Sequence, residues 1–540
     1  MVVWTSLMIL LSATSQAQTG TGAGLGSLWL RHMLDRAHSE QETIEWVRAN
    51  QGRINYDFNP TTYPHSDHGG VAIDRGFHAH GETMPPGLPP FLFRNLGTDF
   101  FGTVFCAKIQ RVTLSNWKRT SLEPLTNLEL LEELVIHSKI EGVDLAPIGN
   151  LKNLRFLALS SPAVSNGSFD PAEESEEHDL SPLGNLVELE YLYLDGSLAG
   201  DLSPLKAMEK LHSLRLSGMR NLTDLSTLQH LVQLKFFESR YNKNLRDYSV
   251  LNALSELEHL ELPSTRMTDL SPLKNLRKLK RLNLNDGSNI SDLSPLANLT
   301  EMEYLDLGWL EIDDLSPLEN MRKLKRLNLR AAEISNLSPL TKMVEMEYLD
   351  LADMEIADLS TIQNLHKLKY LNLDRCYRIS DLSPLAKMVE MEDLRIEDSE
   401  ITDLSPLQDL RNLKELSLGG CKGVSDLSPL THLVEMEYLD LSNTTIDDLS
   451  PLENMEKLQQ LLLGRTGVTD LTPLKNLTNL RRVVLSGNTK ISQTEIDELS
   501  KALPTASIHK AGGGGMGGGR NIWLGMPRIR TQNHLQGGVF

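Results

Sequence analysis

DDLSPLENMRKLKRLNLRAAEI, residues 313–334, contains every feature that decides the fold of this 540-residue chain. Variants of its phrase DLSPL begin 16 times between residues 121 and 470, spaced 22 or 23 residues apart except for one gap of 35 residues. A period of this length indicates a repeat array. One such unit cannot bury its five or six leucine-type side chains alone, so each unit must pack against its neighbours.

Each repeat is expected to form one short strand and one tight turn. In LKRLNL, residues 279–284, Leu282 and Leu284 point to one face while Arg281 and Asn283 point to the other. The proline of LSPL suits the first position of a helical turn, where its missing N–H costs nothing. Too few residues remain for a long helix, so we predict 3₁₀ turns opposite a parallel sheet.

This pattern resembles the leucine-rich repeat family, in particular the 22-residue class found in internalins and in the nuclear regulator of protein phosphatase 1. The resemblance covers roughly residues 110–508. It implies an α/β fold: a leucine-rich repeat solenoid with a curved parallel sheet on its concave side, 3₁₀ or short turns on its convex side, and a cap at each end. One position that is often Asn in the family is here Cys376, Cys421, Thr444 or Ala332, residues that can fill space.

The composition divides the chain into five predicted segments: 1–27, a signal peptide or membrane anchor plus linker; 28–116, an N-terminal cap domain; 117–491, the repeats; 492–510, a capping helix and strand; and 511–540, a Gly-rich disordered tail. The apolar run that ends at Leu11 is too short to span a bilayer, and Ser15 and Ala17 follow it as at a cleavage site. We therefore expect export from the cytoplasm. Ser492 and Glu495 match a capping box at the start of the last helix.

Acidic and basic phrases alternate along the repeats, as in EMEYLDL at 301–307 and KLKRLNL at 323–329. Equivalent residues of successive repeats lie side by side in a parallel sheet, so opposite charges can pair across neighbouring strands. We expect lysines 278 and 280 to face glutamates 301 and 303, which in turn face lysines 323 and 325. Ligand recognition is the alternative interpretation of these charges.

The net charge, the cysteine count and the absence of known catalytic motifs argue against several functions. A net charge of −19 argues against a nucleic-acid partner, which needs clustered Lys and Arg. Three cysteines, Cys106, Cys376 and Cys421, make no disulfide framework. The chain has no GxSxG, HExxH, P-loop or dinucleotide fingerprint, so we predict that it is not an enzyme and needs no cofactor.

The loop 65–82 is the densest polar cluster and contains the weak candidate metal ligands His65, His68, His78 and His80. Their spacing matches no metal signature, and the surrounding Gly and Pro favour a solvated loop.

The outward strand positions are the predicted partner-binding surface, because Tyr and Arg are favoured at interface hot spots and Asp or Asn supplies oriented hydrogen bonds. The predicted binding residues are Arg281, Asn283, Tyr304, Asp306, Trp309, Arg326, Asn328, Arg330, Tyr348, Asp350, Tyr370, Asn372, Arg395, Tyr438 and Asp440. A hydrated sheet face copied by duplication is the alternative.

Together these features predict a monomeric, exported scaffold, similar to an adhesin, that binds a protein ligand through its concave face without catalysis. We expect no nucleic-acid partner and no membrane span beyond an N-terminal anchor. Two other functions stay open. An intracellular regulatory subunit of a phosphatase-like enzyme would retain residues 1–17, and a metal-binding or metalloenzyme N-terminal domain would use the loop 65–82.

Overall fold

The computed structural model describes residues 47, 53–57, 108–115, 121–137, 143–160, 179–196, 199–287, 290–334 and 336–510. They belong to two compact units. The first unit consists of residues up to 356 together with 360–368, and the second consists of 357–359 together with the residues from 369 onward. Residues 1–27, most of 28–116 and 511–540 lie outside the described residues, and the domain boundaries proposed for them stay predictions.

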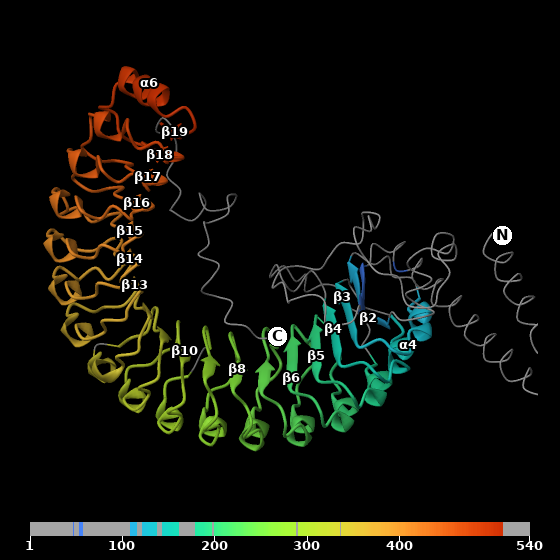
Figure 1. The fold of residues 1–540 in the computed structure, drawn as a ribbon. Coiled ribbons are helices and arrows are strands. Elements are labelled where there is room, and N and C mark those ends of the chain that lie inside the picture. Colours follow the sequence, from blue (N-terminus) through green and yellow to red (C-terminus); the bar gives the residue numbers. More distant parts are fainter. Residues whose placement is uncertain are drawn as a thin grey trace, which may run out of the picture. The chain divides into compact units, whose positions relative to one another are not determined.

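The first unit contains a parallel sheet with one strand per repeat (Figure 1). Its strands are β2 (Lys108–Ser115), β3 (Glu133–His137), β4 (Phe156–Ser160), β5 (Tyr191–Asp195), β6 (Ser213–Ser217), β7 (Phe236–Glu238), β8 (His259–Glu261), β9 (Arg281–Asn283), β10 (Tyr304–Asp306), β11 (Arg326–Asn328) and β12 (Tyr348–Asp350). Strand β1 (Arg53–Asp57) pairs antiparallel with β2. The register joins equivalent residues, so that Leu305 lies between Leu282 and Leu327.

The second unit repeats this arrangement with parallel strands. They are β13 (Tyr370–Asn372), β14 (Asp393–Arg395), β15 (Glu415–Ser417), β16 (Tyr438–Asp440), β17 (Gln460–Leu462), β18 (Arg482–Val484) and β19 (Ser507–His509). Consecutive strands pair with equivalent residues in register, from β13 with β14 to β18 with β19.

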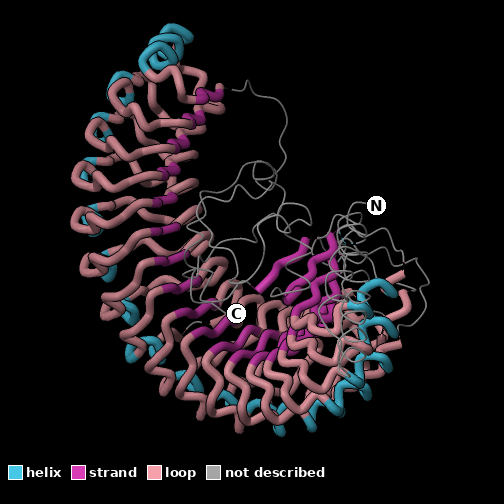
Figure 2. The backbone as a smooth tube through the Cα atoms, turned by 45° about the vertical axis from the view of Figure 1, so that its right-hand side comes forward, coloured by secondary structure: helices cyan, strands magenta, loops and turns pink. Residues whose placement is uncertain are grey.

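Short helical turns precede the strands on the opposite side of each unit (Figure 2), as predicted. In the first unit they are η2 (Glu123–Asn127), the α-helix α4 (Ala146–Gly149), η3 (Ser181–Asn185), η4 (Ser203–Ala207), η5 (Ser226–His230), η6 (Ser249–Ala253), η7 (Ser271–Leu273), η8 (Ser294–Leu296), η9 (Ser316–Leu318), η10 (Ser338–Lys342) and η11 (Ser360–Ile362). In the second unit they are η12 (Ser383–Leu385), η13 (Ser405–Leu407), η14 (Ser428–Leu430), η15 (Ser450–Leu452), η16 (Thr472–Leu474) and the α-helix α6 (Gln493–Ala502).

The aspartate of DLSPL precedes most of the 3₁₀ turns and bonds to their first residue, while Ser121 and Asn336 take its place before η2 and η10. The Oδ1 atom of Asp314 accepts the backbone N–H of Ser316 at 2.8 Å, and its Oδ2 atom accepts the Ser316 hydroxyl at 2.6 Å. These bonds satisfy an N–H that the turn leaves without a partner, and they hold the pKa of Asp314 below its usual value. Pro317, next in the chain, has no N–H to satisfy.

The core is a continuous stack of leucines shared between neighbouring repeats. Leu282 and Leu327 are fully buried and Leu305 is 1% exposed. The position that is often Asn in the family does more than fill space. The Cys421 thiol donates to the Ile396 carbonyl at 2.9 Å, as the Asn488 side chain does to the Leu463 carbonyl at 2.7 Å.

The alternating charges form ion pairs between neighbouring repeats, as predicted. Lys323 Nζ lies 2.6 Å from a Glu301 carboxylate oxygen, and Lys325 Nζ lies 2.9 Å from one of Glu303. The side chains in these pairs are 44–58% exposed. Each pair therefore contributes only about 0.2–1 kcal/mol.

The direct ion pairs of two lysines were not predicted. Lys278 and Lys280 lie 2.6 Å from Glu256 and Glu258 of the preceding repeat. The hydrogen bond to Glu258 raises the pKa of Lys280, and the predicted neighbours, Glu301 and Glu303 of the following repeat, act on Lys280 only as nearby charges that help to raise it. Lys323, Lys367 and Lys414 likewise contact a glutamate of the preceding repeat. From Glu256 to Lys457 the lysine–glutamate pairs therefore run in one direction along the chain, whereas Arg155 pairs with Glu190 and Lys475 with Glu498, both of which follow.

Helix α6 begins where the capping box was predicted. The Ser492 hydroxyl accepts the N–H of Glu495 at 3.1 Å. The Glu495 carboxylate accepts the N–H of Leu471, the residue before the last 3₁₀ turn, at 3.3 Å. A capping role for residues 492–510 stays a prediction.

We expect Leu305→Ala to lower the free energy of unfolding by about 2–5 kcal/mol, because it leaves a cavity between two repeats. Lys323→Ala, which removes an exposed ion pair, should cost no more than about 1 kcal/mol. Urea denaturation followed by circular dichroism measures both variants of the full-length protein. Equal losses for the two variants would contradict a core shared between repeats.

Candidate functional site

The predicted binding residues of the first unit form two columns across β9–β12. Register partners at the first strand position are Arg281, Tyr304, Arg326 and Tyr348. Register partners at the third strand position are Asn283, Asp306, Asn328 and Asp350. The Arg281 guanidinium lies 3.7 Å from the centre of the Tyr304 ring, and that of Arg326 lies 5.6 Å from the Tyr348 ring. The structure thus brings these residues together as an alternating Arg–Tyr surface.

The third-position side chains also hold the turn that follows each strand. The Oδ1 atom of Asp306 accepts the Gly308 N–H at 3.1 Å and the amide of Asn328 at 2.9 Å. A Cβ on Gly308 would lie 2.6 Å from the amide nitrogen of Asn285, so a larger residue there would displace the Asn285 side chain. Asp350 is only 6% exposed and accepts the N–H of its own turn at 3.0 Å. The carboxylates of Asp306 and Asp350 are therefore already engaged in hydrogen bonds within the fold, which leaves fewer acceptor positions for a binding partner.

Trp309 and Arg330 lie beyond the strands, in the turns that follow β10 and β11. The Trp309 side chain is 54% exposed, and the Arg330 guanidinium lies 5.9 Å from its ring centre. Arg330 Nε also donates to the Asp353 carboxylate at 2.9 Å. The two residues are therefore neighbours, next to the Arg–Tyr columns rather than within them.

In the second unit, Arg395 lies at the centre of the predicted site. Its guanidinium lies 5.5 Å from the Tyr370 ring, 3.0 Å from Asp393 and 3.3 Å from Glu415. Burial and the nearby Asp393 carboxylate raise the pKa of Glu415 to about 7.

The other predicted residues of the second unit occupy the same strand positions. Asn372 is the register partner of Arg395 and is only 4% exposed. Tyr438 and Asp440 lie on β16, beyond β15. Asp440 is 9% exposed and accepts the N–H of Ser442 at 2.8 Å, so it too holds its turn.

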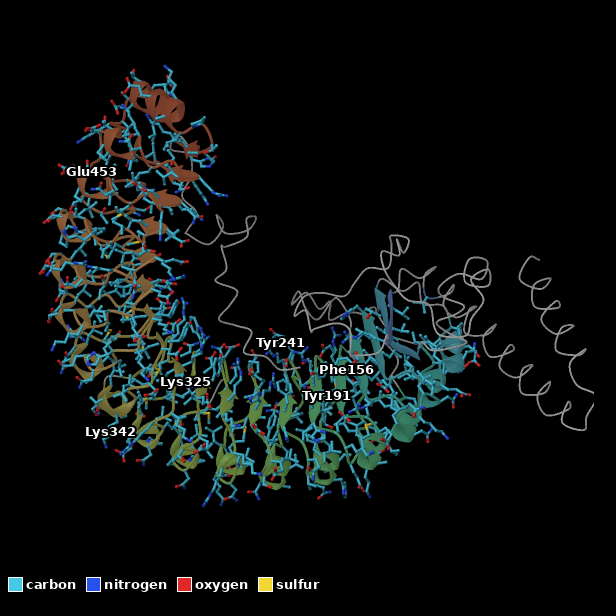
Figure 3. All side chains as sticks on the ribbon, in the orientation of Figure 1. Phe156, Tyr191, Tyr241, Lys325, Lys342 and Glu453 are labelled. Atoms are coloured by element: carbon cyan, nitrogen blue, oxygen red, sulfur yellow. The ribbon has the colours of Figure 1, made fainter. Side chains whose placement is uncertain are left out.

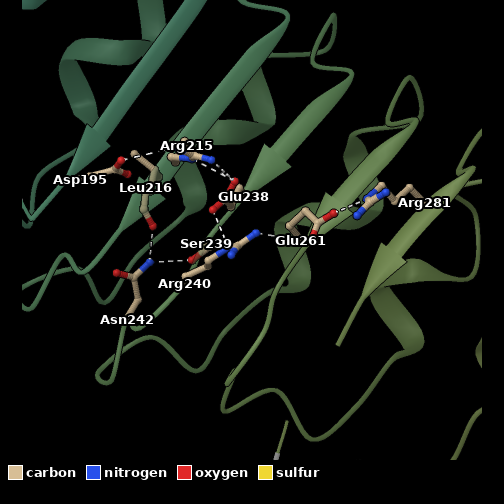
Figure 4. Close-up of polar contacts among 9 residues, drawn as sticks. All are labelled: Asp195, Arg215, Leu216, Glu238, Ser239, Arg240, Asn242, Glu261 and Arg281. Atoms are coloured by element: carbon tan, nitrogen blue, oxygen red, sulfur yellow. Dashed lines mark hydrogen bonds and ion pairs between the residues drawn. The ribbon is translucent and has the colours of Figure 1, made fainter. Parts of the chain in front are cut away.

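A charge network on β5–β9 was missed by the sequence analysis (Figure 4). It consists of Asp195, Arg215, Glu238, Arg240, Glu261 and Arg281. Arg215 lies 2.9 Å from Glu238 and 3.6 Å from Asp195. Arg240 joins Glu238 to Glu261, which also binds Arg281 at 2.6 Å. Because cations and carboxylates are equal in number, the network is neutral as a whole.

Aromatic side chains lie beside this network. The Phe156 ring lies 5.9 Å from that of Tyr191 and 5.3 Å from that of Tyr193, between ring centres. Figure 3 shows Phe156 and Tyr191 on the strand side of the first unit. The strand alternation could have identified both groups, but the predicted binding residues begin at Arg281, and the outward residues of the earlier strands were not considered.

Other predicted sites find no support in the described residues. The candidate metal ligands His65, His68, His78 and His80 lie outside them. Among the residues that the structure describes, no three His, Cys, Asp or Glu side chains could hold a metal ion together. Cys376 and Cys421 are buried cysteines. The described part of the chain also contains no helix long and apolar enough to cross a membrane.

Repeats of 22 or 23 residues, each with one parallel strand and one 3₁₀ turn around a shared leucine core, define a repeat solenoid. A family model for leucine-rich repeats, in two copies, matches residues 255–298 and 344–387. The chain belongs to the leucine-rich repeat family and is of the internalin-like type.

Solved structures support this assignment. The chain is 31% identical to an internalin, InlF, from Listeria monocytogenes, with a TM-score of 0.52 over 56% of this chain and 87% of that chain. A leucine-rich repeat protein from Leptospira interrogans is 21% identical, with a TM-score of 0.52 over 72% of this chain and 93% of that one, and shows the fold alone. Comparison with curated proteins found no match.

We expect Asp195→Asn to change how stability depends on pH. Burial raises the pKa of Asp195 to about 6, although Arg215 opposes this shift. The folded state therefore binds more protons than the unfolded state between about pH 4 and 6, and this carboxyl destabilises the fold increasingly as the pH rises. The free energy of unfolding of the variant, minus that of the wild type, should rise by up to about 3 kcal/mol from pH 4 to pH 7.

Urea titrations at several pH values measure this difference. Asp179→Asn is the control, because hydrogen bonds to Ser181 lower the pKa of Asp179. The Asp179 carboxylate stabilises the fold above the pKa of the unfolded state, and this stabilisation is lost as the pH falls. The free energy of unfolding of Asp179→Asn, minus that of the wild type, should therefore fall as the pH rises. A pH-independent difference for Asp195→Asn would contradict the raised pKa.

Proposed function

We propose that this protein is a non-catalytic scaffold that binds a protein ligand through the outward faces of its strands. The leucine-rich repeat fold is an interaction scaffold, and the sequence contains no catalytic motif. The observation that carries the proposal is the Arg–Tyr column on β9–β12, in which guanidinium groups lie over tyrosine rings. Such side chains present large, preorganised contact area, the usual source of binding energy at interfaces.

The charge network on β5–β9 extends this surface. Its carboxylates are nearly buried, with the Glu238 and Glu261 side chains 4% and 6% exposed, while the arginines are 36–39% exposed. A partner would therefore meet arginine side chains whose charge is already balanced from below. This arrangement favours a partner held by stacking and hydrogen bonds over one attracted by net charge.

Export from the cytoplasm is part of the proposal. The apolar stretch that ends at Leu11 supports it, as does similarity to an internalin. Edman sequencing of the protein purified from its native host tests this point. Retention of residues 1–17 would favour the alternative of an intracellular regulatory subunit.

We expect Arg326→Ala combined with Tyr348→Ala to abolish partner capture, because it removes two neighbouring members of the Arg–Tyr column. The melting temperature should stay nearly unchanged, since the leucine core is intact. Immobilised full-length wild-type and variant proteins, exposed to extracellular proteins of the native environment and compared by quantitative mass spectrometry, measure the loss.

The matched control is Glu319→Ala combined with Lys342→Ala. These exposed side chains lie 3.9 Å apart, and Figure 3 shows Lys342 on the side of the 3₁₀ turns. Proteins captured by the wild type should still be captured by this control. Equal capture by the Arg326–Tyr348 variant, or its failure to fold, would refute the binding assignment.

A further inference from the structure

One residue in the turn after each strand has a left-handed backbone. In the first unit these residues include Ser264, Asp286 and Asp353, with φ angles of 54°, 57° and 61°. This conformation suits Gly, Asn and Asp and is unfavourable for large side chains. The same position nevertheless holds Tyr241 at φ 59° and Trp309 at φ 63°.

Packing does not explain these two aromatic residues. Tyr241 is 53% exposed and Trp309 is 54% exposed. Figure 3 shows Tyr241 at the edge of the ribbon on the strand side of the first unit. A large ring that is both conformationally disfavoured and open to solvent points to a role in contact with something else.

Charged residues follow two positions later, in blocks of one sign. Three successive repeats, on β6–β8, carry Arg220, Lys243 and Arg266. Three further successive repeats, on β10–β12, carry Glu311, Glu333 and Glu355. All except the half-buried Arg220 are exposed. Tyr241 lies next to the basic block and Trp309 next to the acidic block.

These blocks do not stabilise the fold. Like charges in neighbouring repeats lie roughly 5 Å apart and repel. Before the strands, by contrast, opposite charges alternate and pair, as Lys323 does with Glu301. Within the described residues, Lys243, Arg266 and the three glutamates make no ion pair. The turns of the first unit therefore carry a basic half and an acidic half, and Lys243 and Arg266 in one and the glutamates in the other are exposed and make no ion pair among the described residues.

We propose that these eight residues, the turn rim, bind a protein segment whose acidic part lies against β6–β8 and whose basic part lies against β10–β12. Tyr241 and Trp309 pack against the segment beside each charged block. Charge complementarity selects this partner, since a segment of one sign would be repelled by half of the rim. The inference rests on the proposed role in protein binding but uses a surface distinct from the Arg–Tyr columns.

Synthetic peptides test the proposal on the full-length protein. The centres of the two blocks are four repeats apart, roughly 19 Å, which about six extended residues span. The block peptide has four glutamates, a two-residue Gly-Ser spacer and four lysines, so that the centres of its charged blocks are about six residues apart, and the control peptide has the same composition with alternating charges. By fluorescence polarisation, the block peptide should bind at least tenfold tighter, and high salt should remove the difference. Equal affinities would overturn the proposal.

Charge-reversal variants separate the rim from general electrostatic attraction. Lys243→Glu with Arg266→Glu should weaken block-peptide binding at least tenfold. The matched control, Lys274→Glu with Lys342→Glu, changes the net charge equally at exposed lysines beside the 3₁₀ turns and should leave binding unchanged. Equal weakening by both variants would show attraction without a site and refute the proposal.

The variant Trp309→Asn distinguishes a role of Trp309 in peptide binding from a role in stabilising the fold. Asn tolerates the left-handed backbone, so the melting temperature should be unchanged or higher, while block-peptide affinity falls at least fivefold. A lower melting temperature with unchanged affinity would assign Trp309 a structural role. Arg326→Ala with Tyr348→Ala should leave block-peptide binding intact, so failure of the rim and failure of the Arg–Tyr columns give different results.

Discussion

The burial of leucine side chains between neighbouring repeats is the interaction on which the rest of the structure depends. Leu305 has no core of its own and becomes buried only because Leu282 and Leu327 occupy equivalent positions on either side. Every strand must then lie parallel to and in register with the next. The other face of the same strands is left for polar and aromatic side chains, and its chemistry can vary without disturbing the core.

The repeat period was enough to predict the sheet, the 3₁₀ turns and the pairing of opposite charges, because each follows from equivalent residues lying side by side. The direction of the ion pairs was not predictable, since Lys280 has a glutamate on both sides and its reach to Glu258 depends on side-chain geometry. The hydrogen bonds of Asp306 to its turn were equally hidden, because alternation shows which face a residue occupies and not what it contacts. The network around Arg215 was missed because alternation places its arginines and carboxylates on the outward face without showing that they pair across five strands.

Charged residues are arranged differently before and after the strands. Before each strand, glutamate and lysine alternate and neutralise one another, which adds little stability per pair but keeps that edge free of strong fields. After β7, β8 and β10–β12, by contrast, Lys243, Arg266, Glu311, Glu333 and Glu355 make no ion pair among the described residues, and like charges occupy successive repeats. The same residue types thus form pairs at one end of the strands and, in the proposed turn rim, are left for a partner at the other end.

The alternation of glutamate-bearing and lysine-bearing repeats constrains how such an array can change in length. Removing a single repeat by recombination would place two lysine-bearing or two glutamate-bearing repeats side by side, replacing attraction with repulsion at the junction. Removing two together leaves every remaining lysine beside a glutamate, as Lys367 lies beside Glu345. Repeats can therefore be lost in pairs without creating like-charged neighbours, although the structural unit is a single repeat.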